Sequence, residues 1–333
     1  MKILVAPLNW GLGHASRCVP LVQRFLDEGH EVILGGDGAS LTLLRRHFPK
    51  CRYVFLAPLN LRYGKGKRQV WAMVKALPKL VAWAYKDHVM LQAVLREEKI
   101  DMVVSDNRFG LYTNQQSPIT VYITHQLHIF LPKGWRWLEP LVSRLHARIY
   151  TRYNKVWVPD YEELEKSLSG ELGHPAISHQ PSAFSKIEYI GPLSRFAQST
   201  NDKPQTTYGI VAVLSGLEPQ RTMLERELVA RYRDSQEKVL IVQGLLNRPN
   251  TRIKRGAITI VPYMSDEELA AALMGAKHII VRSGYSTIMD LDALSLLPSM
   301  GRSGGASIEF IPTSGQPEQE YLAHFMAEKC QKL

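Results

Sequence analysis

Residues 278–292 read His-Ile-Ile-Val-Arg-Ser-Gly-Tyr-Ser-Thr-Ile-Met-Asp-Leu-Asp, and this stretch decides the fold class. The apolar run 278–281 is long enough for a buried strand and too short for a helix. A tight turn at Gly284 follows, and Ser286 or Thr287 can then cap a helix that we expect to extend through Leu296. A strand that passes through a glycine turn into a helix is the repeating unit of α/β proteins with parallel sheets.

The turn after residue 281 also has the chemistry of an anion site. The first backbone N–H groups of a helix have no partner within the helix and point into the preceding turn. Arg282 adds a guanidinium whose planar fork suits phosphate oxygens, and Ser283 lies beside it. Asp290, one helical turn after Ser286, can accept both hydroxyls of a ribose. The stretch therefore predicts either a nucleotide site or an ordinary strand–turn–helix crossover with a capped helix.

A second strand–turn–helix pattern follows at residues 308–321, Ile-Glu-Phe-Ile-Pro-Thr-Ser-Gly-Gln-Pro-Glu-Gln-Glu-Tyr. Four hydrogen-bonding side chains crowd this turn: Gln316, Glu318, Gln319 and Glu320. A purely structural turn rarely needs four such side chains together, whereas a bound sugar does. The pattern favours a sugar-binding turn.

These two turns resemble the C-terminal half of GT-B glycosyltransferases, and most closely the family of MurG, the bacterial transferase that adds N-acetylglucosamine to a lipid-linked acceptor. The resemblance rests on Arg282-Ser283-Gly284, on Thr287, on the acid at position 290 and on the turn 312–321. It implies that Asp290 holds the ribose and that Gln319 and Glu320 face the donor sugar. The family's usual Glu is Asp290 here, which shortens its reach. Its second Gln is Glu320, which leaves the identity of the sugar open.

Composition is that of an ordinary globular protein. The chain has 333 residues, 45% of them hydrophobic and 22% charged, a length that suggests two domains. No apolar run reaches the roughly 18 residues of a membrane-spanning helix, and the N-terminus leads directly into a strand, so we expect no signal peptide. Three scattered cysteines suit a reducing cytosol. We therefore expect a cytoplasmic protein.

Charge is distributed unevenly along the chain. Residues 1–195 carry 26 Lys/Arg and 16 Asp/Glu, a net charge of +10, whereas residues 196–333 carry 15 of each. No acidic residue lies between Asp37 and Asp87, where eleven Lys and Arg residues occur. A basic surface attracts polyanions such as nucleic acid or the anionic face of a membrane, in contrast to a generic solvated basic face. The basic, aromatic segment 62–75 is the predicted membrane-facing loop, which would place the protein peripherally on the inner face of the cytoplasmic membrane.

The first glycine-rich turn, Asn9-Trp-Gly-Leu-Gly-His-Ala-Ser-Arg17, allows two interpretations. It approximates the dinucleotide-binding pattern, with Asp37 near the position of a ribose-binding acid and Ser16 in place of the third glycine. It also resembles the Gly-rich turn ending in His of the MurG-like family, and a Gly-x-Gly-His-x-x-Arg turn of a related UDP-sugar hydrolase. In that family the turn faces the interdomain cleft. The resemblance makes His14 a candidate general base, with Asn9, Gly11 and Gly13 on the acceptor side.

Two further strand ends carry polar residues. Asn107 follows the strand 100–105, and His125 follows the strand 119–124. Ligands bind at the carboxyl ends of parallel strands, so we expect both residues to line the same site as His14. His125 is a second candidate for the base, and either histidine could instead be structural.

The second domain repeats the α/β pattern. Its first turn, Ser215-Gly-Leu-Glu-Pro-Gln-Arg221, occupies the position of the family's phosphate loop, and Ser215, Gly216 and Arg221 are the predicted contacts. Met264 follows another strand, where a nucleobase can meet backbone groups. We expect strands at 2–7, 31–34, 53–56, 100–105, 119–124, 155–159, 187–190, 208–214, 239–243, 258–261, 278–281 and 308–311, and helices at 19–28, 69–98, 222–232, 266–274, 286–296 and 317–333. The domain boundary is expected at 196–206, between domains 1–195 and 207–333.

The prediction is a GT-B enzyme with two Rossmann-like domains facing across a cleft. It would transfer a sugar such as N-acetylglucosamine, with inversion and without a metal or other cofactor, from a UDP-sugar to an acceptor. The basic domain would hold that acceptor, possibly a polyprenyl-linked or other membrane glycan of the cell envelope. A UDP-sugar hydrolase and a sugar-nucleotide epimerase of the same architecture remain alternatives. A nucleic-acid-binding module is the non-enzymatic alternative and is not expected, because it leaves the polar turn at 316–320 unexplained.

Overall fold

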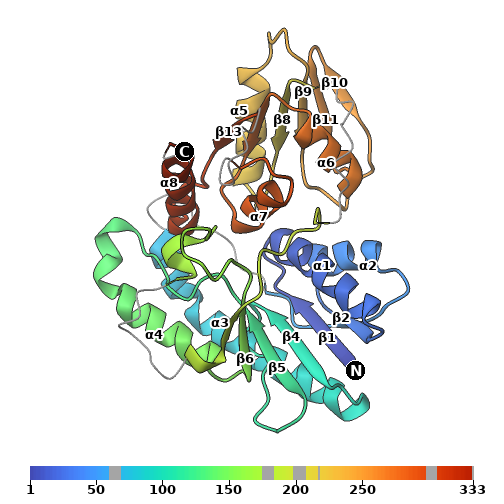
Figure 1. Ribbon diagram of the computed structural model, residues 1–333, viewed down its shortest axis with the longest axis vertical. Helices are drawn as coiled ribbons and strands as arrows, with labels where there is room; N and C mark the ends of the chain where they lie inside the picture. Colours follow the sequence, from blue (N-terminus) through green and yellow to red (C-terminus); the bar gives the residue numbers. More distant parts are fainter. Residues whose placement is uncertain (60–68, 175–183, 198–207, 217, 298–305, 332–333) are drawn as a thin grey trace. The chain divides into compact units, whose positions relative to one another are not determined.

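The computed structural model describes residues 1–59, 69–174, 184–197, 208–216, 218–297 and 306–331 (Figure 1). The chain forms two compact units. The first unit comprises residues 1–9, 14–193 and 315–318, and the second comprises residues 10–13, 194–314 and 319–333.

The first unit is built on a seven-stranded parallel sheet of order β3-β2-β1-β4-β5-β6-β7. Its strands are β1 (Lys2–Pro7), β2 (Glu31–Gly36), β3 (Arg52–Phe55), β4 (Met102–Asp106), β5 (Ile119–Ile123), β6 (Lys155–Val158) and β7 (Ile187–Tyr189). Its helices are α1 (Gly13–Asp27), α2 (Gly38–His47), α3 (Gln69–Glu97) and α4 (Glu139–Tyr150), with short 3₁₀ turns at Lys133–Leu138, Gly170–Leu172 and Phe184–Lys186. The strand order reverses between β1 and β4, and ligands bind beyond the carboxyl ends of strands at such a point.

The second unit contains a six-stranded sheet of order β10-β11-β9-β8-β12-β13, in which only β10 runs antiparallel to its neighbour. Its strands are β8 (Ile210–Val213), β9 (Val239–Val242), β10 (Ile253–Arg255), β11 (Ile258–Val261), β12 (His278–Val281) and β13 (Ser307–Phe310). Its helices are α5 (Gln220–Arg231), α6 (Asp266–Met274), α7 (Tyr285–Ala293) and α8 (Pro317–Gln331). Two parallel-sheet α/β domains confirm the predicted fold class.

Apolar residues that alternate along the strands form the cores. In the first unit, Leu91 of α3 packs with Leu4, Ile33 and Val103 of three neighbouring strands. In the second unit, Leu224 and Leu228 of α5 pack in one buried cluster with residues of β8, β9, β11 and β12. Burial of these side chains stabilises each unit by about 25 cal/mol for each Å² of apolar surface removed from water.

Several element boundaries differ from the predictions. Helix α1 begins at Gly13 rather than at residue 19, which places His14 and Arg17 within its first two turns. Helix α7 begins at Tyr285, its N-cap Gly284 makes no side-chain cap bond, and it ends at Ala293. The predicted capping by Ser286 or Thr287 and the extension through Leu296 were therefore wrong. Of the predicted loop 62–75, residues 62–68 lie outside the described residues and residues 69–75 form the start of helix α3 instead of a loop. Of the predicted linker 196–206, only residues 196–197 are described.

A buried arginine, Arg108, follows β4 and joins four other segments of the first unit. Arg108 is fully buried and donates to both carboxylate oxygens of Asp87 on α3, at 2.8 Å each, and to Asp37 at 3.1 Å. It also donates to the carbonyls of Pro7 and Ala57. Burial raises the pKa of the Asp87 carboxyl, and the Arg108 charge and hydrogen bonds oppose that rise. This network ties α3 and the start of α2 to the central strands.

Candidate active site

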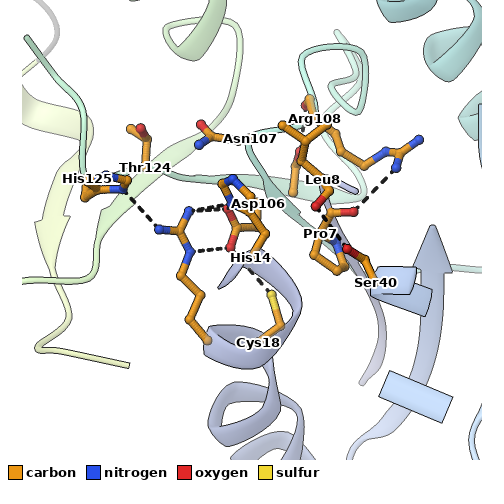
Figure 2. Close-up of polar contacts among 12 residues, drawn as sticks. Pro7, Leu8, His14, Cys18, Ser40, Asp106, Asn107, Arg108, Thr124 and His125 are labelled. Carbon is orange, nitrogen blue, oxygen red and sulfur yellow. Dashed lines mark hydrogen bonds and ion pairs between the residues drawn. The ribbon is translucent and has the colours of Figure 1, made fainter. Parts of the chain in front are cut away.

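A histidine and a carboxylate meet at the carboxyl end of the first sheet. His14 lies in the first turn of α1, and Asp106 is the last residue of β4. The Nδ1 atom of His14 lies 2.8 Å from Oδ1 of Asp106 (Figure 2). The Asp106 side chain is fully buried, whereas 16% of the His14 side chain is exposed. The pair thus has a buried end and an accessible end.

Arg17 shares the same carboxylate. Its Nε donates to Oδ2 and its Nη2 donates to Oδ1, a bidentate arrangement. Burial alone would raise the pKa of the Asp106 carboxyl, but the charge of Arg17, followed by the interactions with His14, holds that pKa well below its usual range. Asp106 is therefore a carboxylate at every physiological pH, and it can only accept hydrogen bonds.

The ionised carboxylate fixes the tautomer of His14. Nδ1 of His14 lies 2.8 Å from Asp106, which cannot donate, and 3.1 Å from Nη2 of Arg17, which cannot accept. The shorter contact, to the ionised carboxylate, places the proton on Nδ1, and the approach of Arg17 to this nitrogen is then not a hydrogen bond. In the neutral imidazole, Nε2 then carries the lone pair. His14 consequently has the form of a general base whose orientation is set by a carboxylate.

His125 adopts the opposite form. Nη1 of Arg17 lies 3.1 Å from Nδ1 of His125, and a guanidinium can only donate, so Nδ1 is the acceptor. Within the first unit, Nε2 of His125 lies 2.8 Å from Oε1 of Glu318 and donates to it. Burial lowers the pKa of His125, against the opposing interaction with Glu318. Both nitrogens of His125 are occupied, which leaves His14 as the base that geometry favours.

The predicted acceptor-side residues lie in two places. Asn107 follows Asp106 with a positive φ of 56°, and its Oδ1 accepts a 2.8 Å bond from the Tyr122 hydroxyl. Figure 2 places Asn107 at the same end of the sheet as His14. Asn9 donates to Asp37 at 2.7 Å, so the predicted ribose-binding acid of the dinucleotide interpretation is engaged by Asn9 and Arg108. Gly11 lies in the turn before α1, with a φ of 76° that favours glycine, and Gly13 is the first residue of that helix.

Asp290 lies on α7 of the second unit, where its side chain contacts Ser194 and Arg195 of the same unit. Its Oδ1 accepts a 2.6 Å bond from the Ser194 hydroxyl, and its Oδ2 lies 3.7 Å from Nε of Arg195. Arg195 also pairs with Asp266 at 3.1 Å. Burial raises the pKa of Asp290 to about 6, although Arg195 and Ser194 favour the ionised form. A ribose diol at Asp290 would therefore have to replace the Ser194 hydroxyl.

The raised pKa of Asp290 leads to a prediction of how the free energy of unfolding depends on pH. The folded protein binds the Asp290 proton more tightly than the unfolded chain, so the resulting stabilisation is present below pH about 4 and is lost as the pH rises through about 6. The loss is on the order of 2–3 kcal/mol, since one pKa unit corresponds to about 1.4 kcal/mol. We expect Asp290→Asn to gain that much relative to wild type between pH 4 and pH 7, measured by urea unfolding. Parallel pH profiles of the two proteins would contradict titration of Asp290 in this range.

The other residues of the β12–α7 turn are placed differently from the prediction. Arg282 is buried and donates through Nη1 and Nη2 to the carbonyls of Ile311, Pro312 and Gln220, so these two nitrogens serve the backbone rather than a phosphate. Its Nε is buried without a hydrogen-bond partner among the described residues. The Ser283 hydroxyl donates to the carbonyl of Gln319 at 2.7 Å. Gly284, Ser286 and Thr287 are half-buried at the start of α7.

The predicted phosphate loop follows β8. Ser215 is half-buried, and Gly216 is exposed with a φ of 95°. Arg221 is buried and pairs with Glu218 and Glu225. These two carboxylates neutralise the guanidinium that was predicted to contact a diphosphate. Met264 is half-buried between β11 and α6.

The four side chains of the second turn divide between the units. Gln316 and Glu318 belong to the first unit, and Gln319 and Glu320 to the second. The side chain of Gln319 accepts a 2.8 Å bond from the Thr313 N–H, and Glu320 is exposed. The turn thus uses Gln319 to shape its own backbone.

Two residues of the site were not predicted from the sequence. Asp106 ends a buried strand directly before Asn107, and Arg17 lies three residues after His14, hence on the same helix face. The His-x-x-Arg spacing and the strand-end acid were the available signals. Among the residues that the structure describes, no group of three or more His, Cys, Asp or Glu side chains is arranged to hold a metal ion.

Comparisons with known proteins place this geometry in context. No protein-family model matches the chain. Two curated relatives, from Methanosarcina acetivorans and Methanosarcina mazei, are each named an uncharacterized glycosyltransferase. Each is 24% identical over 345 residues, which cover 99% of this chain and 84% of the relative.

Similar solved structures are also glycosyltransferases. The glycotransferase of kitacinnamycin has a TM-score of 0.60 at 12% identity, over 98% of this chain and 84% of that one. Arabidopsis thaliana UGT89C1 complexed with UDP-L-rhamnose has a TM-score of 0.54. The spinosyn rhamnosyltransferase SpnG complexed with thymidine diphosphate has a TM-score of 0.51. Each of these two proteins is 14% identical to this chain, over 99% of this chain and 92% of the other. These findings confirm the predicted GT-B fold and the predicted enzyme class. The narrower resemblance to the MurG-like family stays a prediction.

Proposed function

We propose that the protein is an inverting glycosyltransferase in which His14 is the general base that activates an acceptor hydroxyl. The observation that carries the proposal is the His14–Asp106 pair, in which a buried carboxylate fixes the imidazole with its lone pair on Nε2. A base of this kind contributes about 10²- to 10⁴-fold to a proton-transfer step.

The proposed step is a single displacement. The acceptor oxygen gives its proton to Nε2 of His14 and forms a bond to the anomeric carbon of the donor sugar. The bond from that carbon to the diphosphate breaks, and the nucleoside diphosphate leaves with the electron pair. Because the attack comes from the face opposite the leaving group, the anomeric configuration inverts. Asp106 stabilises the imidazolium that forms.

The donor in this proposal is a UDP-sugar, such as UDP-N-acetylglucosamine. The support is the resemblance of the 278–321 turns to UDP-sugar transferases, together with the UDP-L-rhamnose complex of UGT89C1. The thymidine diphosphate complex of SpnG makes dTDP-sugars the second candidate class. The backbone at Gly216 and at the start of α7 would take the charge of the leaving diphosphate, without a metal ion. Asp290 would hold the ribose.

The donor prediction is tested by thermal-shift binding of UDP-, GDP-, ADP- and dTDP-sugars and NAD, with EDTA present, to wild type and Asp290→Ala. Stabilisation follows RT ln(1 + [L]/Kd), so a millimolar ligand at a micromolar site contributes about 4 kcal/mol. We expect a shift with UDP-sugars that is lost in Asp290→Ala. A response to NAD alone would favour the dinucleotide interpretation, and free sugar released without an acceptor would identify a hydrolase.

The proposed acceptor is a membrane-linked glycan, and the support is one face of α3. Leu77, Val81, Tyr85 and Val89 recur every four residues and are 45–69% exposed. Residues four apart lie on one side of a helix. Lys75, Lys79 and Lys86 are exposed beside them, and the one acid of that stretch, Asp87, is buried. An apolar row flanked by lysines suits an anionic bilayer surface. None of the described helices is long and apolar enough to cross a membrane.

Vesicle sedimentation tests this face. Two exposed apolar side chains contribute on the order of 2–3 kcal/mol when buried. We therefore expect the double change Val81→Glu and Tyr85→Glu to weaken binding to vesicles of anionic lipid at least about tenfold. Met223→Glu on α5, which is 61% exposed against 69% for Val81 and for Tyr85, is the control and should bind as wild type. Equal binding of all three proteins, or binding to neutral vesicles alone, would rule out this membrane face.

A further inference from the structure

We propose that Ser307 is an activated nucleophile that reacts with acyl esters, with His278 as its general base and Glu309 as the residue that orients this base. The three side chains lie on β12 and β13 of the second unit. Ser307 and His278 are the first residues of their strands, whereas the predicted donor turns follow the last residues of strands. The inference therefore concerns a second site and does not rest on the proposed function.

The register of the sheet brings the three side chains together. His278 is paired with Ser307 on the neighbouring parallel strand. Glu309 lies two residues after Ser307, and side chains two residues apart on a strand point to the same face. The imidazole of His278 contacts both of them. Its Nδ1 lies 2.6 Å from Oγ of Ser307, and its Nε2 lies 3.2 Å from Oε2 of Glu309.

The carboxylate sets the direction of both hydrogen bonds. Arg231, the last residue of α5, donates to Oε1 of Glu309 at 2.8 Å, and this bond lowers the pKa of Glu309 against the opposing effect of burial. An ionised carboxylate only accepts, so in the neutral imidazole the proton is on Nε2 of His278 and the lone pair is on Nδ1. The Ser307 hydroxyl donates to that lone pair, since its other contact, with the Lys277 carbonyl, is longer at 3.5 Å.

The nucleophile is accessible and has a backbone donor beside it. Ser307 is exposed, as is 26% of the His278 side chain. The N–H groups of Ser307 and Ile311 donate to residues beside or in β12. Successive residues of a strand direct their N–H groups to opposite sides, so the N–H of Ile308 points away from β12, and β13 is the outermost of the described strands. The N–H of the residue after a nucleophile can stabilise an oxyanion.

The reaction needs no cofactor. Oγ of Ser307 forms a bond to the acyl carbon while its proton passes to Nδ1 of His278, and the carbonyl oxygen takes the negative charge. The bond from the acyl carbon to the alcohol oxygen then breaks, and the alcohol leaves with the proton from Nδ1. Water, deprotonated by the same nitrogen, releases the acid and restores Ser307. Glu309 is a positioning residue, because it acts only through His278.

Covalent labelling at pH 7 with an alkyl fluorophosphonate tests the proposal. In this probe Oγ forms a bond to phosphorus, fluoride leaves, and the product is a stable ester that intact mass and peptide mapping detect. We expect one label, on Ser307, that is absent in Ser307→Ala. The labelling rate should fall at least about tenfold in His278→Gln. Glu309→Gln should also lower it, and Glu309→Asp, which keeps the charge, should restore part of the loss.

Ser265 is the internal control. It is an exposed serine whose Oγ accepts from the Glu268 N–H and has no histidine among its described hydrogen-bond partners. Its peptide should stay unlabelled. Equal labelling of Ser265 and Ser307, labelling that persists in the unfolded protein, or no label on Ser307 would each overturn the proposal. None of these measurements needs a nucleotide sugar, so their outcome is independent of the transferase function.

Discussion

Replacing His14 with glutamine is expected to lower kcat for sugar transfer about 10²- to 10⁴-fold, with the donor still bound. Glutamine fills a similar space but cannot take a proton from the acceptor hydroxyl. Asp106→Asn should cost a similar factor, because the amide no longer fixes the proton of His14 on Nδ1. The measurement is kcat at saturating donor and acceptor, with donor binding checked separately by thermal shift.

His125→Gln provides the contrast. Both ring nitrogens of His125 are engaged by Arg17 and Glu318, so its loss should reduce kcat by less than about tenfold. A larger loss in His125→Gln than in His14→Gln would reverse the assignment of the base. Full activity in His14→Gln would remove acid–base catalysis by this pair from the mechanism.

Replacing Arg108 with methionine is expected to lower the free energy of unfolding by about 3–5 kcal/mol, the usual cost of leaving a buried charge without its partner. Asp87 would lose two hydrogen bonds and Asp37 one, and the Pro7 carbonyl would lose the Arg108 donor, whereas the Ala57 carbonyl would keep the Trp83 indole N–H. Urea unfolding at pH 7 measures the effect.

Arg24→Met is the matched control for this second prediction. Arg24 is 72% exposed and pairs with Glu28 one turn away, so its loss should cost less than about 1 kcal/mol. A cost for Arg108→Met as small as that of the control would show that the two carboxylates need no cation. Because burial raises the pKa of Asp87, the cost should also fall as the pH is lowered and that carboxyl takes a proton.

The sheet strands were predictable because their apolar runs are short and flanked by turn residues. β11, β12 and α6 begin and end where the pattern placed them. Three elements escaped prediction for physical reasons. All three residues of β10 are exposed, so the strand has no core pattern. The apolar residues Leu141 and Leu145 of α4 face solvent. The short helix α2 starts at Gly38, a residue that usually ends helices.

The candidate site was predictable only in part. The glycine-rich turn before His14 indicates this residue, but the helical pattern predicts a helix only from residue 19 and so misses the first turns of α1. The polar residues Ser16 and Arg17 are buried in the site rather than exposed, so the amphipathic pattern of a surface helix is absent there. The partnership of Arg17 with Asp106 spans 89 residues of sequence, a separation over which local patterns carry no information.

Three successive residues at the end of β4 serve two separate ion-pair networks. Asp106 belongs to the network of His14 and Arg17, and Arg108 belongs to that of Asp87 and Asp37, while Asn107 with its left-handed backbone lies between them. A substitution within residues 106–108 and a deletion within them are therefore expected to have different consequences. A substitution in one network leaves the contacts of the other in place. Deletion of one of these three residues would instead change the spacing between Asp106 and Arg108, on which both networks depend.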